Sequence, residues 1–294
     1  MKKLLMIINP VAGRKSIQHM IPQIVRIFMD AGYLCTVMVT AEAGEATQLV
    51  QKYSVGFDLL VVAGGDGTLN EAVAGLMCCN RKIPLGYIPC GSTNEFAAAH
   101  GIPTGIPAAA KAIAAGKLRM CDIGLFGSQV FCGAAIFGAF SWMGYTTDQD
   151  MKNIFGMGAY VMDGAHDLSR IEPIHLRLHT ADHTYEDDYV FGAISNAETL
   201  AGILHYPSGF VETNDGKLEA LLIRKPQSLA DWQQLLRCIR LRDLEHCSFV
   251  DILKSDSYTV EIPEGAIWSL DGENSGTQTC TKVSVLSGLL QLKM

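Results

Sequence analysis

The sequence predicts an α/β N-terminal domain with a parallel sheet, followed by a mostly antiparallel β-sandwich domain. Up to about residue 120, short apolar segments alternate with segments whose apolar residues recur at helical spacing, which is typical of parallel strands covered by helices. After Asp122 most segments are strand-like, and several alternate between apolar and polar residues. We therefore expect domains at residues 1–122 and 123–286, followed by a C-terminal segment at 287–294.

Short apolar runs indicate the strands of both domains. In the first domain they are Leu4–Ile8, Leu34–Thr40, Asp58–Ala63 and Pro84–Ile88. In the second they are His175–His179, Tyr189–Ile194, Lys217–Ile223, Ser257–Ile262, Ile267–Leu270 and Thr279–Leu286. A helix is predicted after the first strand, because apolar residues recur there at helical spacing, namely Ile17, Met20, Ile21, Ile24 and Phe28. Ser228 is the expected N-cap of a helix in the second domain.

Three of the predicted strands end in loops of glycine and small polar residues. These loops follow Ile8, Ala63 and Pro89. Glycine leaves room for phosphate oxygens to approach main-chain N–H groups, and the helix that opens near Leu69 adds its positive dipole end. Ligands of open parallel sheets bind beyond the carboxyl ends of the strands, so we expect the loops to share one crevice. Asp66 could hold a metal ion or organise its waters; the alternative is a tight strand-to-helix turn with an incidental acid.

The segments NPVAG, GGDGTLNEAV and PCGSTNEFA, in this order and spacing, resemble the bacterial diacylglycerol/lipid kinase family. That family shares its catalytic domain with eukaryotic diacylglycerol and sphingosine kinases. The GGDG segment alone would equally suit NAD kinases or phosphofructokinases, but the Asn-Glu that follows it and the later GSTNEF favour lipid kinases. Similar residues recur at 121–124, 214–218 and 270–273, so the resemblance spans nearly the whole chain.

The resemblance implies that the first domain binds ATP. The implied nucleotide-binding residues are Asn9, Pro10, Val11, Ala12, Gly13, Thr40, Gly64, Gly65, Asp66, Gly67, Thr68, Leu69, Asn70, Glu71, Ser92 and Asn94. Glu71 could instead be an acid favoured by the dipole of its own helix, and Thr40 a plain strand-end residue. Where relatives carry a basic residue after the third loop, this chain has Ala98, for which Arg14 or Lys15 could substitute.

Two carboxylates follow a predicted strand in the segment Asp271-Gly272-Glu273. Side chains two residues apart on an extended chain share a face, and the glycine between them allows a bend into a cleft. The resemblance makes Glu273 the general base that deprotonates the lipid hydroxyl, with Asp271 as its partner or as a metal organiser, and with Asp66 as a third catalytic acid. The alternative is an exposed turn, since Asp, Gly and Asn are common turn formers.

A separate metal site is implied in the second domain. Asp215 matches the family position that holds a structural magnesium ion, supported by main-chain carbonyls near Glu212 and Lys217. Oxygen ligands suit this cation. The alternative is that Asn214-Asp215-Gly216 forms only a hairpin turn.

Composition and charge limit the class of protein. The net charge of −7, with no basic run, argues against nucleic-acid binding. Nine scattered cysteines are expected to be reduced core residues of a cytoplasmic protein. The uncharged segment Ile123–Thr147 is long enough for a membrane span, but its glycines favour buried strands, which could line an acyl-chain pocket at Phe137 and Phe140. We expect the chain to have no transmembrane segment and to associate peripherally with the membrane during turnover. A homodimer is compatible with the sequence.

The sequence as a whole predicts an ATP- and Mg²⁺-dependent lipid kinase that phosphorylates the hydroxyl of diacylglycerol or a similar lipid at the membrane surface. The resemblance also implies that residues 287–294 pack back on the first domain. One alternative is an NAD kinase-like enzyme, which shares GGDG and would phosphorylate a soluble ribose. Another is a lipid- or nucleotide-binding regulator without turnover, which the loss of a basic residue at Ala98 would favour.

Overall fold

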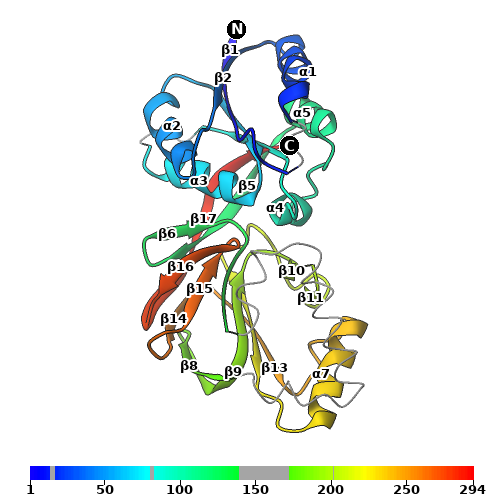
Figure 1. Ribbon diagram of the computed structural model, residues 1–294, viewed down its shortest axis with the longest axis vertical. Coiled ribbons are helices and arrows are strands. Elements are labelled where there is room, and N and C mark those ends of the chain that lie inside the picture. The colour runs from blue at the N-terminus through cyan, green and yellow to red at the C-terminus, as the bar shows by residue number, and fades with distance from the viewer. Residues whose placement is uncertain (14–16, 80–82, 139–171, 201) are drawn as a thin grey trace. The chain divides into compact units, whose positions relative to one another are not determined.

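The computed structural model describes residues 1–13, 17–79, 83–138, 172–200 and 202–294 (Figure 1). The chain divides into two compact units, one of Met1–Ile123 with Leu286–Met294 and one of Gly124–Val285. The first unit is built of helices and parallel strands, and the second mainly of antiparallel strands. The predicted fold class is confirmed.

A parallel sheet forms the centre of the first unit. Its strands are, in spatial order, β4 (Leu85–Pro89), β3 (Leu59–Gly64), β1 (Lys2–Ile8) and β2 (Tyr33–Val39). The final part of β17 (Cys280–Lys293) joins this sheet, where Leu292 pairs in parallel with Leu85. Residues 4–8 of β1 and all of β3 are buried, as their uninterrupted apolar sequences predict for strands covered on both faces.

Helices follow the first four strands in turn. They are α1 (Ile17–Asp30), α2 (Glu45–Tyr53), α3 (Asp66–Met77), α4 (Glu95–Ala99) and α5 (Ile106–Ala115). Figure 1 shows α1 packed beside α5, and α2 beside α3. Because α3 and α4 begin close behind the ends of β3 and β4, the glycine-containing loops lie at the carboxyl ends of parallel strands.

The described residues of the second unit form an antiparallel sheet and one long helix. The sheet runs, in spatial order, through β16 (Glu273–Thr277), β15 (Ile267–Leu270), β7 (Ala134–Gly138), β9 (Thr184–Ser195), β8 (Ile174–His179), β14 (Ser257–Glu261) and the first part of β17. Further pairs are β12 (Leu218–Arg224) with β9 and with β13 (Val250–Ser255), β6 (Gln129–Phe131) with β5 (Leu118–Phe126), and β10 (Thr199–Leu200) with β11 (Leu204–His205). The helix is α7 (Leu229–Leu241), which Ser228 caps as predicted.

Strand β12 is buried on both faces. Leu218, Ala220 and Leu222 lie in a cluster with Trp268, whereas Leu221 packs on the other side in a cluster with α7. Both faces of the strand are thus covered, which explains why its sequence is almost uninterrupted by polar residues. Glu219 is the exception within this run, because its side chain is ionisable and yet fully buried, and this burial raises its pKa to about 7.

The described part of the uncharged segment forms strands. Gly127, with φ +59°, lies in the turn between β5 and β6, where Phe126 pairs with Gln129. Phe137 is 0% exposed, and its ring centroid lies 4.8 Å from that of Trp268, so it belongs to the core of the second unit. Phe140 and the rest of the segment lie outside the described residues. No helix among the described residues has the length and apolar character needed to cross a membrane.

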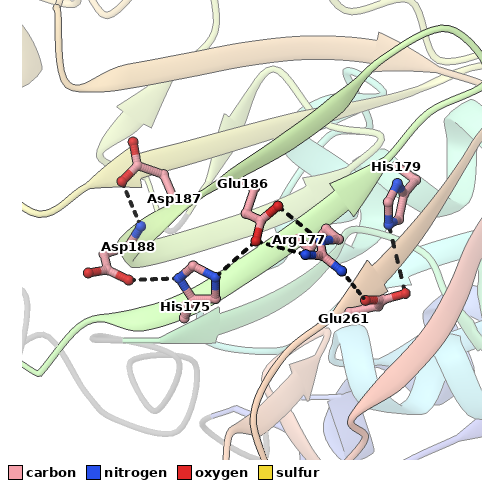
Figure 2. A network of polar contacts seen from close by, with 7 residues as sticks. All are labelled: His175, Arg177, His179, Glu186, Asp187, Asp188 and Glu261. Carbon is pink, nitrogen blue, oxygen red and sulfur yellow. Dashed lines mark hydrogen bonds and ion pairs between the residues drawn. The ribbon is translucent and has the colours of Figure 1, made fainter.

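The strict alternation predicted for β8 is present. Leu176 and Leu178 are fully buried, and the polar residues of the strand face solvent (Figure 2). There Arg177 bonds Glu186 on β9 at 2.9 and 3.0 Å, and His175 lies 3.0 Å from Asp188. The carboxylates of Asp188 and Glu186 accept hydrogen bonds from the imidazole of His175 and so raise its pKa. All these groups are exposed, so the network adds little to stability.

A partly buried histidine supports the third loop of the first unit. His100, directly after α4, packs on Phe96 with 4.3 Å between ring centroids, and its Nε2 lies 3.2 Å from Sγ of Cys121. Burial lowers the pKa of His100 to about 4, and the charge of Arg119 acts in the same direction. Burial likewise raises the pKa of Cys121 to about 12, so this neutral pair is part of the core.

The low pKa of His100 predicts a loss of stability in mild acid. The unfolded state takes up this proton near pH 6.5 and the folded state only near pH 4, so the free energy of unfolding falls as the pH drops between these values. At pH 5 the loss should be about 2 kcal/mol relative to pH 7. In urea unfolding, the free energy of unfolding of His100→Gln should therefore fall about 2 kcal/mol less than that of the wild type between pH 7 and pH 5. The exposed His19→Gln is the control, and equal pH dependence in His100→Gln would contradict the assignment.

Candidate functional site

The loop after β1 is tied to the start of α3 in the first unit. Asn9 Nδ2 donates to Thr68 Oγ1 at 2.9 Å, and Asn9 Oδ1 accepts from the N–H of Val11 at 3.1 Å. Thr68 is itself largely buried and leaves no room beside Gly64, where a Cβ would lie 2.6 Å from that of Thr68. One side-chain amide thus fixes both the turn of the first loop and its position against the second.

Asp66 joins the loop after β3 to the loop after β4. Its Oδ2 accepts from Thr93 Oγ1 at 3.3 Å and from the N–H of Glu95 at 3.0 Å, and its Oδ1 accepts from the N–H of Phe96 at 3.4 Å. The carboxylate therefore caps α4. Burial raises the pKa of Asp66, and the hydrogen bonds from Glu95 and Phe96 oppose that rise. Asp66, which the sequence suggested as a metal ligand, therefore already accepts hydrogen bonds from the loop after β4.

Glycine is required where these loops touch. Gly13 has φ +54°, and a Cβ there would collide with the carbonyl oxygen of Cys90. A Cβ on Gly91 would lie 2.7 Å from Cα of Gly65. Asn94 fixes Gly91 from the other side, because its Oδ1 accepts from the N–H of Gly91 at 2.8 Å and its Nδ2 donates to the carbonyl at 2.9 Å. The three loops therefore pack backbone against backbone.

The N-terminus of α3 lies where these loops meet. Its N-cap residue is Gly65, which has no side chain to cap the helix, and Asp66 and Thr68 in its first turn make the contacts to the other two loops. The N–H groups of a helix start carry partial positive charge and bind phosphate groups. The arrangement combines this charge with glycine backbone that a phosphate can approach closely.

Several predicted nucleotide-binding residues have side chains that form hydrogen bonds within the first unit or lie in its core. Thr40 Oγ1 donates to the carbonyl of Ile8 at 3.4 Å. Glu71 accepts from the N–H groups of Gly44 at 2.7 Å and Ala46 at 3.1 Å, so it caps α2. Leu69 is fully buried. The remaining predicted residues, which are exposed or partly exposed, are Pro10, Val11, Ala12, Gly67, Asn70 and Ser92. Arg14 and Lys15 lie outside the described residues.

In the second unit, Asp271 anchors the turn that leads to Glu273. Asp271 and Gly272 have φ of +49° and +84° and connect β15 to β16 as a two-residue hairpin turn, in which Leu270 pairs with Glu273. The Asp271 carboxylate accepts main-chain N–H groups of Cys132 at 2.6 Å, Gly133 at 2.7 Å and Ala134 at 2.9 Å. Glu273 is the exposed first residue of β16. Its position is therefore set by three amides gathered on one carboxylate.

The predicted metal ligand Asp215 contacts a lysine. Its Oδ1 accepts from the N–H of Lys217 at 3.0 Å, and its Oδ2 lies 2.7 Å from Nζ of Lys254. The side chains of Glu212 and Lys217 are exposed. Sequence reasoning missed Lys254, because the strand that carries it, β13, was not predicted. Among the described residues, the one group of His, Cys, Asp and Glu with metal-ligand spacing is Asp243, Glu245 and His246, outside every predicted site.

Comparison with known proteins identifies the family. Residues 3–126 match the family model described as "Diacylglycerol kinase catalytic domain". The chain is 30% identical over 280 residues to a diacylglycerol kinase of Bacillus subtilis (strain 168), covering 94% of this chain and 91% of that protein. It is 26% identical over 276 residues to a diacylglycerol kinase of Staphylococcus saprophyticus, covering 94% of this chain and 90% of that protein.

Solved structures agree on the fold. The crystal structure of a putative diacylglycerol kinase from Bacillus anthracis str. Sterne aligns with a TM-score of 0.79 at 24% identity, covering 99% of this chain and 96% of that one. At this identity the likeness shows the shared fold. The sequence similarity to the Bacillus subtilis relative and this shared fold indicate the same family. The chain belongs to the diacylglycerol kinase family of lipid kinases, as the order and spacing of its three glycine-containing loops predicted.

Proposed function

We propose that this protein transfers the terminal phosphoryl group of ATP to the hydroxyl of diacylglycerol or a closely similar lipid, in the cytoplasm at the membrane surface. The observation that carries the proposal is the joining of three strand-end loops around the N-terminus of α3 by Asn9, Asp66 and close glycine contacts. Phosphoryl transfer needs its donor positioned and its charge stabilised, and little covalent chemistry from the protein. Family membership supplies the lipid as acceptor class.

The first unit binds the phosphates of ATP in this proposal. Main-chain N–H groups in the first turn of α3, residues 66–68, face the phosphates, and the dipole of α3 adds positive charge. Mg²⁺, which accompanies the nucleotide, would neutralise charge on the transferred phosphoryl group. The contacts of Asp66, Thr40 and Glu71 support roles for their side chains in positioning the loops.

Glu273 is the proposed general base for the lipid hydroxyl. A carboxylate takes the proton of an alcohol only as the oxygen attacks, so it must be within hydrogen-bond reach of that oxygen. Asp271 is a positioning residue in this proposal, because its carboxylate fixes the turn from which Glu273 extends.

The first test replaces Glu273. Glu273→Gln keeps the size of the side chain but cannot accept the proton, so we expect kcat for transfer from ATP to diacylglycerol in mixed micelles to fall at least about 100-fold. ATP binding should be unchanged. The exposed Glu264→Gln on the same unit is the matched control. A kcat for Glu273→Gln within twofold of wild type would exclude the proposed base. Offering NAD as acceptor in the same assay tests the NAD kinase alternative, and binding of both ligands without transfer would support the regulator.

The second test concerns the contact between the first two loops. Asn9→Ala and Thr68→Val each remove the hydrogen bond of 2.9 Å, so each should weaken ATP binding about 10-fold. Because both variants break the same interaction, the double variant should be scarcely weaker than either single one. The dissociation constant for ATP, measured by calorimetry on the four proteins, checks this. Losses that simply add would show that the contact does not organise the site.

A further inference from the structure

A partly buried ammonium group lies against the turn that carries Asp215. Lys254 Nζ donates to the carbonyl oxygen of Phe210 at 2.7 Å, lies 2.7 Å from Asp215 Oδ2 and lies 3.2 Å from Glu219 Oε1. The ring of Phe210 covers it, with 5.5 Å from Nζ to the ring centroid. An ammonium has three N–H donors, and three oxygens lie within 3.2 Å of this one. The group is thus held as a bound cation would be, by oxygen atoms of two carboxylates and one carbonyl.

Glu219 gives this ammonium a fully buried partner in the second unit. Its side chain is 0% exposed, and Lys254 is its one cationic partner within 4.0 Å among the described residues. Glu219 and Lys254 are directly paired across β12 and β13, so the register of the sheet places the two side chains together. A buried carboxylate that loses its counter-charge destabilises a protein strongly. The ammonium therefore cannot leave the site without cost.

A magnesium ion does not fit beside this group. Mg²⁺ requires oxygen ligands at about 2.0–2.1 Å in octahedral arrangement. On Asp215, one carboxylate oxygen already contacts the ammonium at 2.7 Å and the other accepts the N–H of Lys217 at 3.0 Å. An ion at Oδ2 would either lie against a like charge or displace Lys254 from its buried partner. Either arrangement opposes binding.

We propose that Lys254 is the resident cation of the Asp215 site and takes the place of the structural magnesium that the family resemblance implies. The second unit then needs no divalent ion for its stability, and any requirement for Mg²⁺ belongs to nucleotide binding. Replacing Lys254 by an apolar residue should turn Asp215 and Glu219 into a carboxylate pair that takes up a divalent cation.

The test measures thermal unfolding of the full chain without nucleotide or lipid, in EDTA and in 5 mM MgCl₂ or CaCl₂. Tryptophan fluorescence reports the second unit, since the three tryptophans are residues 142, 232 and 268. The wild-type Tm should be the same in all three solutions. Lys254→Met should have a lower Tm in EDTA and gain about 5 °C or more with the divalent ion. Lys282→Met, an exposed lysine of the same unit, is the matched control and should behave as wild type.

Two results would overturn the proposal. One is a wild-type Tm that rises by several degrees with Mg²⁺ and loses this response in Asp215→Asn. The other is a Lys254→Met protein that folds and shows no response to either ion. If Lys254→Met does not fold, the wild type and Asp215→Asn are titrated with Mn²⁺, and binding is followed by the electron paramagnetic resonance signal of the ion. Mn²⁺ that binds the wild type and does not bind Asp215→Asn would contradict a resident ammonium. None of these measurements depends on kinase activity.

Discussion

The contact of glycine backbone between three loops is the constraint on which the first unit depends. Parallel strands bring the loops after β1, β3 and β4 to the same edge of the sheet, and a Cβ at Gly13 or Gly91 would push them apart. Hydrogen bonds donated by Asn9 and accepted by Asp66 hold the loops once they are close. The glycine at the start of α3 then lies against the glycine backbone of the neighbouring loop, which suits an anion bound through main-chain N–H groups.

The acids that stand out in the sequence mostly bind main-chain N–H groups. Asp66 caps α4, Glu71 caps α2, and Asp271 gathers three amides in the second unit. Such charge-assisted hydrogen bonds are stronger than neutral ones and satisfy donors that no helix or sheet could pair. These bonds hold loops in place, whereas Glu273 is exposed at the start of β16.

The sequence predicted the fold class and most strands because these depend on local patterns. The buried faces of β1 and β3, the alternation of β8 and the cap at Ser228 are all legible in a few consecutive residues. Contacts between distant segments could not be predicted from such local patterns. Glu71 caps a helix 25 residues earlier, and Asp271 reaches amides at a separation of more than 130 residues, which no local pattern records. The polar sequence of β16 and the partly exposed β13 gave no clear strand pattern, so the partner of Glu219 could not be anticipated.

A tethered ammonium and a bound metal ion solve the same electrostatic problem differently. Both balance carboxylates that the turn after Phe210 brings together, but the lysine is present at one copy per chain whatever the ion concentration, and folding alone delivers it. The cost is the ordering of a long side chain and the desolvation of its charge, which the oxygens and the ring of Phe210 offset. A metal site can be emptied by a chelator, whereas this one is lost only when β12 and β13 separate. The sheet register that pairs Glu219 with Lys254 thus brings the cation to its carboxylates, as ligand affinity would at a metal site.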